Sequence, residues 1–123
     1  CSTSGGQKGL GQIFRFVPGR GRGPDMVELF FESESKDQFN FGDNLTVSPN
    51  GHLIVCEDQY TDVVDNHLRG ITPDGRAYTL ARLTMQTELA GACFSPDGKW
   101  LFVNAYSPTR TVAITGPWDR FMT

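Results

Sequence analysis

Acidic and amide side chains stand at both ends of one short β-hairpin pattern. Asp43 and Asn44 directly precede a short apolar run, and Glu57 and Asp58 directly follow a second one. Between the runs, Ser-Pro-Asn-Gly at 48–51 is typical of a turn, because proline presets φ and glycine accepts positive φ. The strands of a hairpin are antiparallel, so its entry and exit lie at one end. We therefore expect the four polar side chains to gather at the end opposite the turn.

A related pattern follows along the chain. The sequence at 47–51 recurs in altered form at 94–98, and a further hairpin pattern surrounds the Pro-Asp-Gly at 73–75. Two hairpins in each repeat give four antiparallel strands, which is typical of a β-propeller blade. Glu88 precedes the first strand of the second repeat, and Asn104 ends its second strand. The predicted polar end, called the rim below, therefore comprises Asp43, Asn44, Glu57, Asp58, Glu88 and Asn104.

Carboxylate and amide oxygens that converge in this way suit a hard metal ion such as Ca²⁺, Mg²⁺, Mn²⁺ or ferric iron. The alternative is structural, since Asp and Asn flank turns in any β protein by bonding their own backbone. His67 begins a strand on the rim, where it is a ligand candidate, although a lone histidine favours a structural role. His52 adjoins the opposite turn, and we expect it to face solvent.

Composition and charge argue against several classes of protein and of metal site. The 123 residues have a net charge of −3 and no basic run, which argues against a nucleic-acid binder. No apolar stretch approaches the roughly 20 residues of a membrane span. The three cysteines form no Cys-x-x-Cys pair, which argues against a structural zinc site. Cys56 and Cys93 lie in apolar strands, and we expect both thiols to be buried.

The 14 glycines and 7 prolines punctuate the chain at short intervals, which predicts an all-β fold. Residues 1–42 are expected to form the outer strands of one blade, 43–82 a full blade and 83–123 most of a further blade. A closed propeller has at least four blades. These residues form about two four-stranded antiparallel blades, so we expect them to be part of a larger, about six-bladed propeller. The other blades belong either to a longer chain, which we favour, or to further copies assembled into a ring. Strands are expected at 11–17, 26–32, 45–47, 53–55, 67–72, 77–82, 89–95, 100–104 and 111–115.

The chain resembles the C-terminal part of the PhoX-type alkaline phosphatases. The most specific segments are Asp-Asn-Leu at 43–45, Cys-Glu-Asp at 56–58 and Glu-Leu-Ala-Gly-Ala at 88–92. Less specific segments at 1–6, 11–16, 70–75 and 114–118 follow in the same order. The resemblance therefore extends over nearly the whole chain.

The resemblance implies a bacterial phosphomonoesterase on a β-propeller, exported to the periplasm or secreted by the twin-arginine route. It implies phosphate monoesters as substrates and Ca²⁺ and Fe³⁺ as cofactors, held by carboxylates at the propeller centre. Asp43, Asn44, Glu57 and Glu88 are the implied metal or inner-shell groups, and Asp58 is a weaker candidate. The residues single out no catalytic base.

Two other functions remain open at this point. The first is a non-catalytic propeller module that binds a ligand or partner, with several copies assembled into a ring. The second is a lactonase-type hydrolase propeller with one divalent metal, which an Asp-Asn pair before a first strand also suits. Solution mass and lactone substrates would distinguish these functions from a phosphatase.

Overall fold

The computed structural model describes residues 1–121, and in this part of the chain the fold is all-β, as the turn spacing predicts. Nine strands form three antiparallel sheets, and one short helix follows the last strand. The strands are β1 (Gln12–Val17), β2 (Met26–Glu32), β3 (Gly42–Val47), β4 (Leu53–Glu57), β5 (His67–Ile71), β6 (Ala77–Arg82), β7 (Leu89–Phe94), β8 (Trp100–Ala105) and β9 (Arg110–Thr115), and the helix is α1 (Trp118–Phe121).

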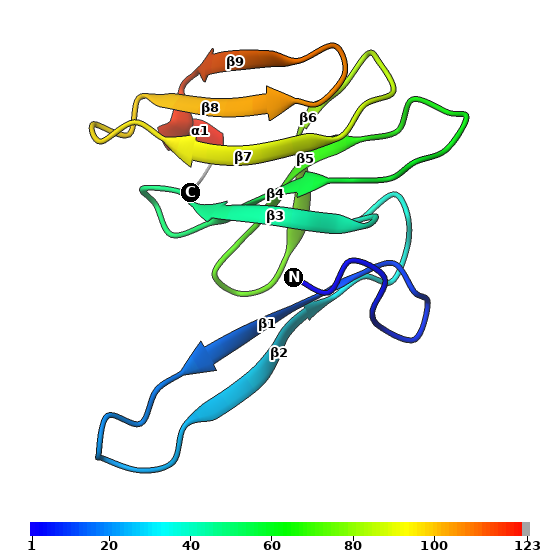
Figure 1. Cartoon of the computed structure of the whole chain (residues 1–123). Helices are drawn as coiled ribbons and strands as arrows, with labels where there is room; N and C mark the ends of the chain where they lie inside the picture. Colours follow the sequence, from blue (N-terminus) through cyan, green and yellow to red (C-terminus); the bar gives the residue numbers. More distant parts are fainter. Residues whose placement is uncertain (122–123) are drawn as a thin grey trace.

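The three sheets are blade-like and lie beside one another (Figure 1). The central sheet has the order β3-β4-β5-β6, so each strand pairs with the next along the chain. The β1-β2 hairpin lies on one side of it, and β7-β8-β9 lies on the other (Figure 1). The predicted division into residues 1–42, 43–82 and 83–123 stays a prediction. In the structure β3 begins at Gly42, and residues 122–123 of the predicted third part lie outside the described residues. A closed ring of blades remains a prediction.

Strand β4 contributes side chains to both hydrophobic cores. Successive side chains of a strand point to opposite faces of its sheet. Ile54 and Cys56 are buried in the core shared with β7 and β8, whereas Val55 is buried in the core shared with β1 and β2. The central blade is therefore packed on both faces, with β4 at the junction.

The flanking sheets each leave apolar side chains exposed. Phe14 and Phe16 of β1 are exposed. β1 pairs along its length with β2, and an isolated bridge joins its first residue, Gln12, to Ser2. Trp100 and Phe102 are exposed on β8 at the other end of the stack. These side chains suit contact with further sheets, because large contiguous apolar patches are unusual on the surface of a monomer.

The prediction that His52 faces solvent is wrong. Its side chain is buried, and its Nδ1 lies 3.0 Å from the hydroxyl of Tyr78 on β6. The His52 backbone N–H also donates to Ser48 Oγ across the turn. The turn itself projects outward and leaves the imidazole packed edge-on against the Tyr78 ring. Proximity in sequence to an exposed turn therefore did not predict exposure.

Helix α1 is absent from the sequence prediction. It has only four residues, too few to show a helical apolar period, and Pro117 directly precedes it. The Trp118 indole N–H donates to the Lys99 carbonyl, and its ring contacts Phe94 edge-on. The helix thus covers one end of the third sheet. Among residues 1–121, no helix is long and apolar enough to cross a membrane.

Gly70 on β5 is required by close packing, and its replacement by alanine is expected to destabilise the chain. A Cβ atom at Gly70 would lie 1.9 Å from Cζ of Tyr78, its partner in the β5–β6 ladder. Overpacking of this kind costs about 1–3 kcal/mol. Urea denaturation of Gly70→Ala should show this loss. Gly116→Ala is the control, since a Cβ there meets nothing within 4 Å, and equal stability of the two variants would contradict the prediction.

Candidate metal centre

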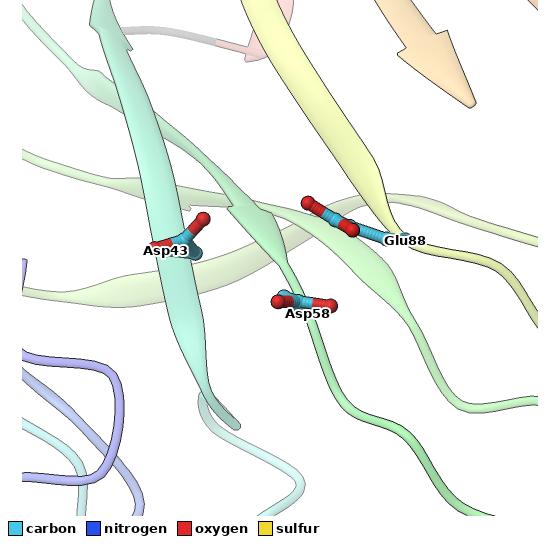
Figure 2. Close-up of side chains that lie close together, drawn as sticks. All are labelled: Asp43, Asp58 and Glu88. Atoms are coloured by element: carbon cyan, nitrogen blue, oxygen red, sulfur yellow. The ribbon is translucent and has the colours of Figure 1, made fainter. Parts of the chain in front are cut away.

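Three of the rim carboxylates converge in the structure. Asp43, Asp58 and Glu88 each offer one oxygen, and these oxygens all lie within 4.8 Å of one another. Asp43 is the second residue of β3, Asp58 directly follows β4, and Glu88 directly precedes β7. Figure 2 shows the three side chains turned toward a common space between these strands. We call this set the acidic cluster.

An irregularity in β3 sets the position of Asp43. Gly42 pairs with Glu57 and Asn44 pairs with Cys56, so Asp43 is the extra residue of a β-bulge. A bulge bends its strand and re-aims the side chain of the extra residue. The bulge is supported by tight packing, because a Cβ at Gly42 would lie 2.0 Å from Cζ of the buried Phe39. The sequence pattern alone does not show this irregularity.

The carboxylates of the acidic cluster repel one another. Burial is the largest cause of the raised pKa of Asp58, and the neighbouring charges of Glu88 and Asp43 raise that pKa further. Slight desolvation, followed by the charges of Glu88 and Asp58, also raises the pKa of the exposed Tyr60 phenol. A positive ion at the cluster would relieve this repulsion.

The raised pKa of Asp58 gives the metal-free chain a specific pH dependence. The folded state holds this proton more tightly than the unfolded state, so ionisation of Asp58 lowers stability as the pH rises through the raised pKa. We expect this component of stability to return as the pH falls toward the ordinary carboxyl range near ~4. In chelator, the melting temperature of wild type should therefore approach or exceed that of Asp58→Asn on acidification. A difference between the two proteins that stays constant with pH would contradict this expectation.

The donor set of the acidic cluster fits a hard cation. Among the described residues, the buried side-chain oxygens without a hydrogen-bond partner include Asp58 Oδ1, Gln59 Oε1 and Gln86 Oε1. These three residues belong to the two loops that carry Asp58 and Glu88. Three converging carboxylates, one of which has an oxygen without a donor, are the kind of ligand that Ca²⁺ and other hard ions prefer.

Glu57, by contrast, does not lie in the acidic cluster. Its side chain is fully buried and accepts hydrogen bonds from the backbone N–H groups of Asn40 and His67 and from Arg69 Nε at 2.7 Å. It also lies 2.8 Å from His67 Nδ1. The period of two along β4 places Glu57 on the face opposite Cys56. We therefore leave Glu57, although expected as a ligand from the family resemblance, out of the proposed metal site.

Arg69 is the residue of this network that the sequence reasoning missed. Besides Glu57, the guanidinium contacts Thr79 Oγ1 and the carbonyls of Lys36 and Asp37. The buried ion pair thus anchors the segment that leads into β3. A charged residue between Leu68 and Gly70 in an apolar strand was the available signal, because a buried charge needs a partner. His67 belongs to the same network, which agrees with the structural role favoured from the sequence.

The two rim asparagines each bond a neighbouring strand. Asn44 Oδ1 accepts a hydrogen bond of 3.0 Å from the Gly91 N–H, which connects β3 to β7. Asn104 Oδ1 accepts a bond of 2.7 Å from Thr111 Oγ1, which connects β8 to β9. Asn44 therefore holds β3, which carries Asp43, to β7, which directly follows Glu88.

The cysteines divide between buried and exposed positions. Cys56 is buried as predicted, but the prediction for Cys93 is wrong, because its side chain is exposed. Cys93 pairs with the exposed Phe102, on the face of the third sheet away from the central blade. Burial, with smaller contributions from Asp43 and Glu88, raises the pKa of Cys56 to about 11.

These environments predict a clear difference in thiol reactivity. The thiolate is the reactive species, so a buried thiol with a raised pKa should react slowly. A disulfide reagent at pH ~8 is expected to modify Cys1 and Cys93 rapidly, and Cys56 only after unfolding. Cys93→Ser should lower the rapid count from two to one. Rapid modification of all three thiols in the folded chain would contradict the prediction.

The comparison that decides the family covers most of the chain. The family model described as alkaline phosphatase PhoX matches residues 3–109. The chain belongs to the PhoX family. The match includes Asp43, Asp58 and Glu88, and the resemblance read from the sequence is confirmed. Comparisons with curated proteins and with solved structures gave no match.

Proposed function

We propose that this PhoX-family chain takes part in the metal-dependent hydrolysis of phosphate monoesters. The observation that carries the proposal is the convergence of Asp43, Asp58 and Glu88 within the region that the family model matches. In this proposal the three carboxylates hold a hard cation. Ca²⁺ is the first ion to test, and Fe³⁺ is the second ion that the family resemblance implies.

Different residues of the chain would have different roles at such a site. A bound cation would neutralise charge on the phosphoryl oxygens and activate an oxygen nucleophile. Asp58 and Glu88 are half-buried and would grip the ion from the protein side, while Asp43 is exposed and leaves the opposite side open. Asn44 keeps β3 and β7 together beside them through its bond to the Gly91 N–H. The site would thus be rigid on one side and accessible to substrate on the other.

We further propose that the exposed faces of β1 and β8 pack against additional blades of a larger propeller. Phe14, Phe16, Trp100 and Phe102 would be buried by such contacts. Other blades would then supply the remaining metal ligands and the groups that bind phosphate. By the family resemblance, the protein would be bacterial and exported by the twin-arginine route to the periplasm or beyond.

The function is tested by metal content and phosphate release. Elemental analysis and solution mass of the purified chain are followed by assays with p-nitrophenyl phosphate and a simple lactone. The phosphatase proposal expects Ca²⁺-dependent phosphate release, abolished by chelator, from the longest protein that contains this sequence. A metal-loaded protein that releases no phosphate would overturn it, and lactone turnover would favour the lactonase reading instead. A closed oligomer of this chain without turnover would favour the non-catalytic ring.

A further inference from the structure

We propose that Asn66 is a positioning residue that holds Asp58 and Glu88 at the separation a shared cation needs. This inference rests on the proposed function, because it assigns Asn66 a role toward the same metal site. It follows from the contacts of a side chain that none of the sequence motifs singles out.

Asn66 is completely buried, and its amide joins two loops. Its Oδ1 accepts a hydrogen bond of 2.8 Å from the Gln59 N–H, and its Nδ2 donates to the Gln59 carbonyl at 3.1 Å. The same Nδ2 donates to the Thr87 carbonyl at 2.8 Å. One side chain thus bonds the backbone of the residue after Asp58 and the residue before Glu88.

These two acids need such support because neither lies in a strand. Asp58 begins the loop between β4 and β5, and Glu88 ends the loop between β6 and β7. The Asp58 N–H donates to the Phe41 carbonyl, but this bond leads toward β3 and not to the loop that carries Glu88. Two carboxylates within 4.8 Å also repel each other. The Asn66 amide supplies the missing connection, and Gln86 Nε2 adds a second bond between the loops, to the Gln59 carbonyl.

The connection extends beyond Asn66 to the third sheet. The Tyr106 N–H donates to the Glu88 carbonyl, and the Ser107 N–H donates to Thr87 Oγ1. Glu88 is therefore held between Asn66 on one side and the segment after β8 on the other. Loss of the Asn66 side-chain hydrogen bonds should make the backbone at 87–88 more mobile and weaken these two bonds.

Thr72 provides a matched control at the turn end of the same blade. Thr72 Oγ1 also anchors backbone, by accepting from the Arg76 N–H and bonding the Arg76 carbonyl. Thr72→Ala removes buried side-chain-to-backbone bonds, as Asn66→Ala does, but far from the acidic cluster. A purely structural role for Asn66 predicts the same effects from both variants.

The test measures Ca²⁺ affinity by calorimetry on the full chain, alongside thermal stability. Asn66→Ala is expected to weaken Ca²⁺ binding about 10–100-fold, the usual effect of losing a residue that orients metal ligands. Thr72→Ala should leave the affinity within about twofold. If Asn66→Ala does not fold, the milder Asn66→Ser takes its place. Wild-type affinity in the Asn66 variant would overturn the inference.

Amide hydrogen exchange provides a readout that needs no metal. Asn66→Ala should accelerate exchange at Gln59, Tyr106 and Ser107 at least tenfold, whereas Thr72→Ala should accelerate Gly75 and Arg76 instead. A wild-type chain that binds no Ca²⁺ would count against the proposed function, and the exchange data would then decide the role of Asn66 alone. Unchanged exchange at Tyr106 and Ser107 would overturn that role.

Discussion

Replacing Glu88 by glutamine is expected to weaken Ca²⁺ binding by a factor on the order of 100 or more. Glu88 is one of the three carboxylates whose oxygens lie within 4.8 Å of one another. Two unit charges 4 Å apart near a protein surface attract by about 4 kcal/mol. Each 1.4 kcal/mol corresponds to about a tenfold change in affinity. Removing one of three ligand charges therefore has a large effect, even after a generous allowance for solvent.

The same substitution should behave differently in the absence of metal. Glu88→Gln removes a charge that raises the pKa of Asp58 and therefore opposes its ionisation. In chelator, we expect the variant to unfold at the same temperature as wild type or at a higher one. Weaker binding together with undiminished metal-free stability separates loss of a ligand from misfolding.

Asp62→Asn is the matched control for this experiment. Asp62 is an exposed acid in the loop that follows Asp58, and it lies outside the acidic cluster. The variant makes the same change in net charge, so it reports any general electrostatic effect on Ca²⁺ binding. Calorimetry should give nearly wild-type affinity for Asp62→Asn. Equal loss in both variants would show that the chain binds Ca²⁺ by surface charge rather than at the acidic cluster.

The second large effect is expected from Glu57→Ala. This substitution leaves Arg69 buried, with 3% of its side chain exposed, and without its carboxylate. Removing one member of a buried ion pair typically costs 3–5 kcal/mol, because the other charge stays uncompensated. Much of the stability of a domain of this size would be lost. Urea denaturation of the metal-free chain measures the effect.

The double variant Glu57→Leu/Arg69→Met distinguishes an unpaired charge from a general packing defect. With both charges gone, the desolvation cost disappears as well, and the double variant should be markedly more stable than Glu57→Ala. Asp74→Ala, which breaks the exposed pair with Arg76, should change stability far less than Glu57→Ala does. A double variant as unstable as Glu57→Ala would show that Arg69 stabilises the loop through its other bonds.

The strands and turns could be predicted from the sequence because their signals are local. β2 and β6 begin and end at the predicted residues, and the turns at Gly51 and Gly98 adopt the positive φ that glycine favours. Such features depend on strand formers bounded by turn residues. The same reasoning placed Asp43 and Glu88 at one end of the blades.

The details of the rim depended on contacts between distant segments. Glu57 and Asp58 are adjacent in sequence, yet the sheet places them on different sides, one with Arg69 and the other with Glu88. The alternation of side chains along β4 could have indicated this separation, since Glu57 lies on the same face as Val55. Asn66 gave no local signal, because its three bonds reach residues 7 and 21 positions away.

The sharing of β4 between two cores has a consequence for how the chain unfolds. The neighbouring residues Ile54 and Val55 pack against different flanking sheets, so the central blade has no core of its own. In repeat proteins, stability is the sum of each unit's intrinsic stability and its interfaces with neighbours. Because both cores lie between blades, we expect the blades to unfold as one cooperative unit rather than one at a time. Deleting the β1-β2 hairpin would therefore weaken the distant β7-β8-β9 sheet, although the two sheets share no strand.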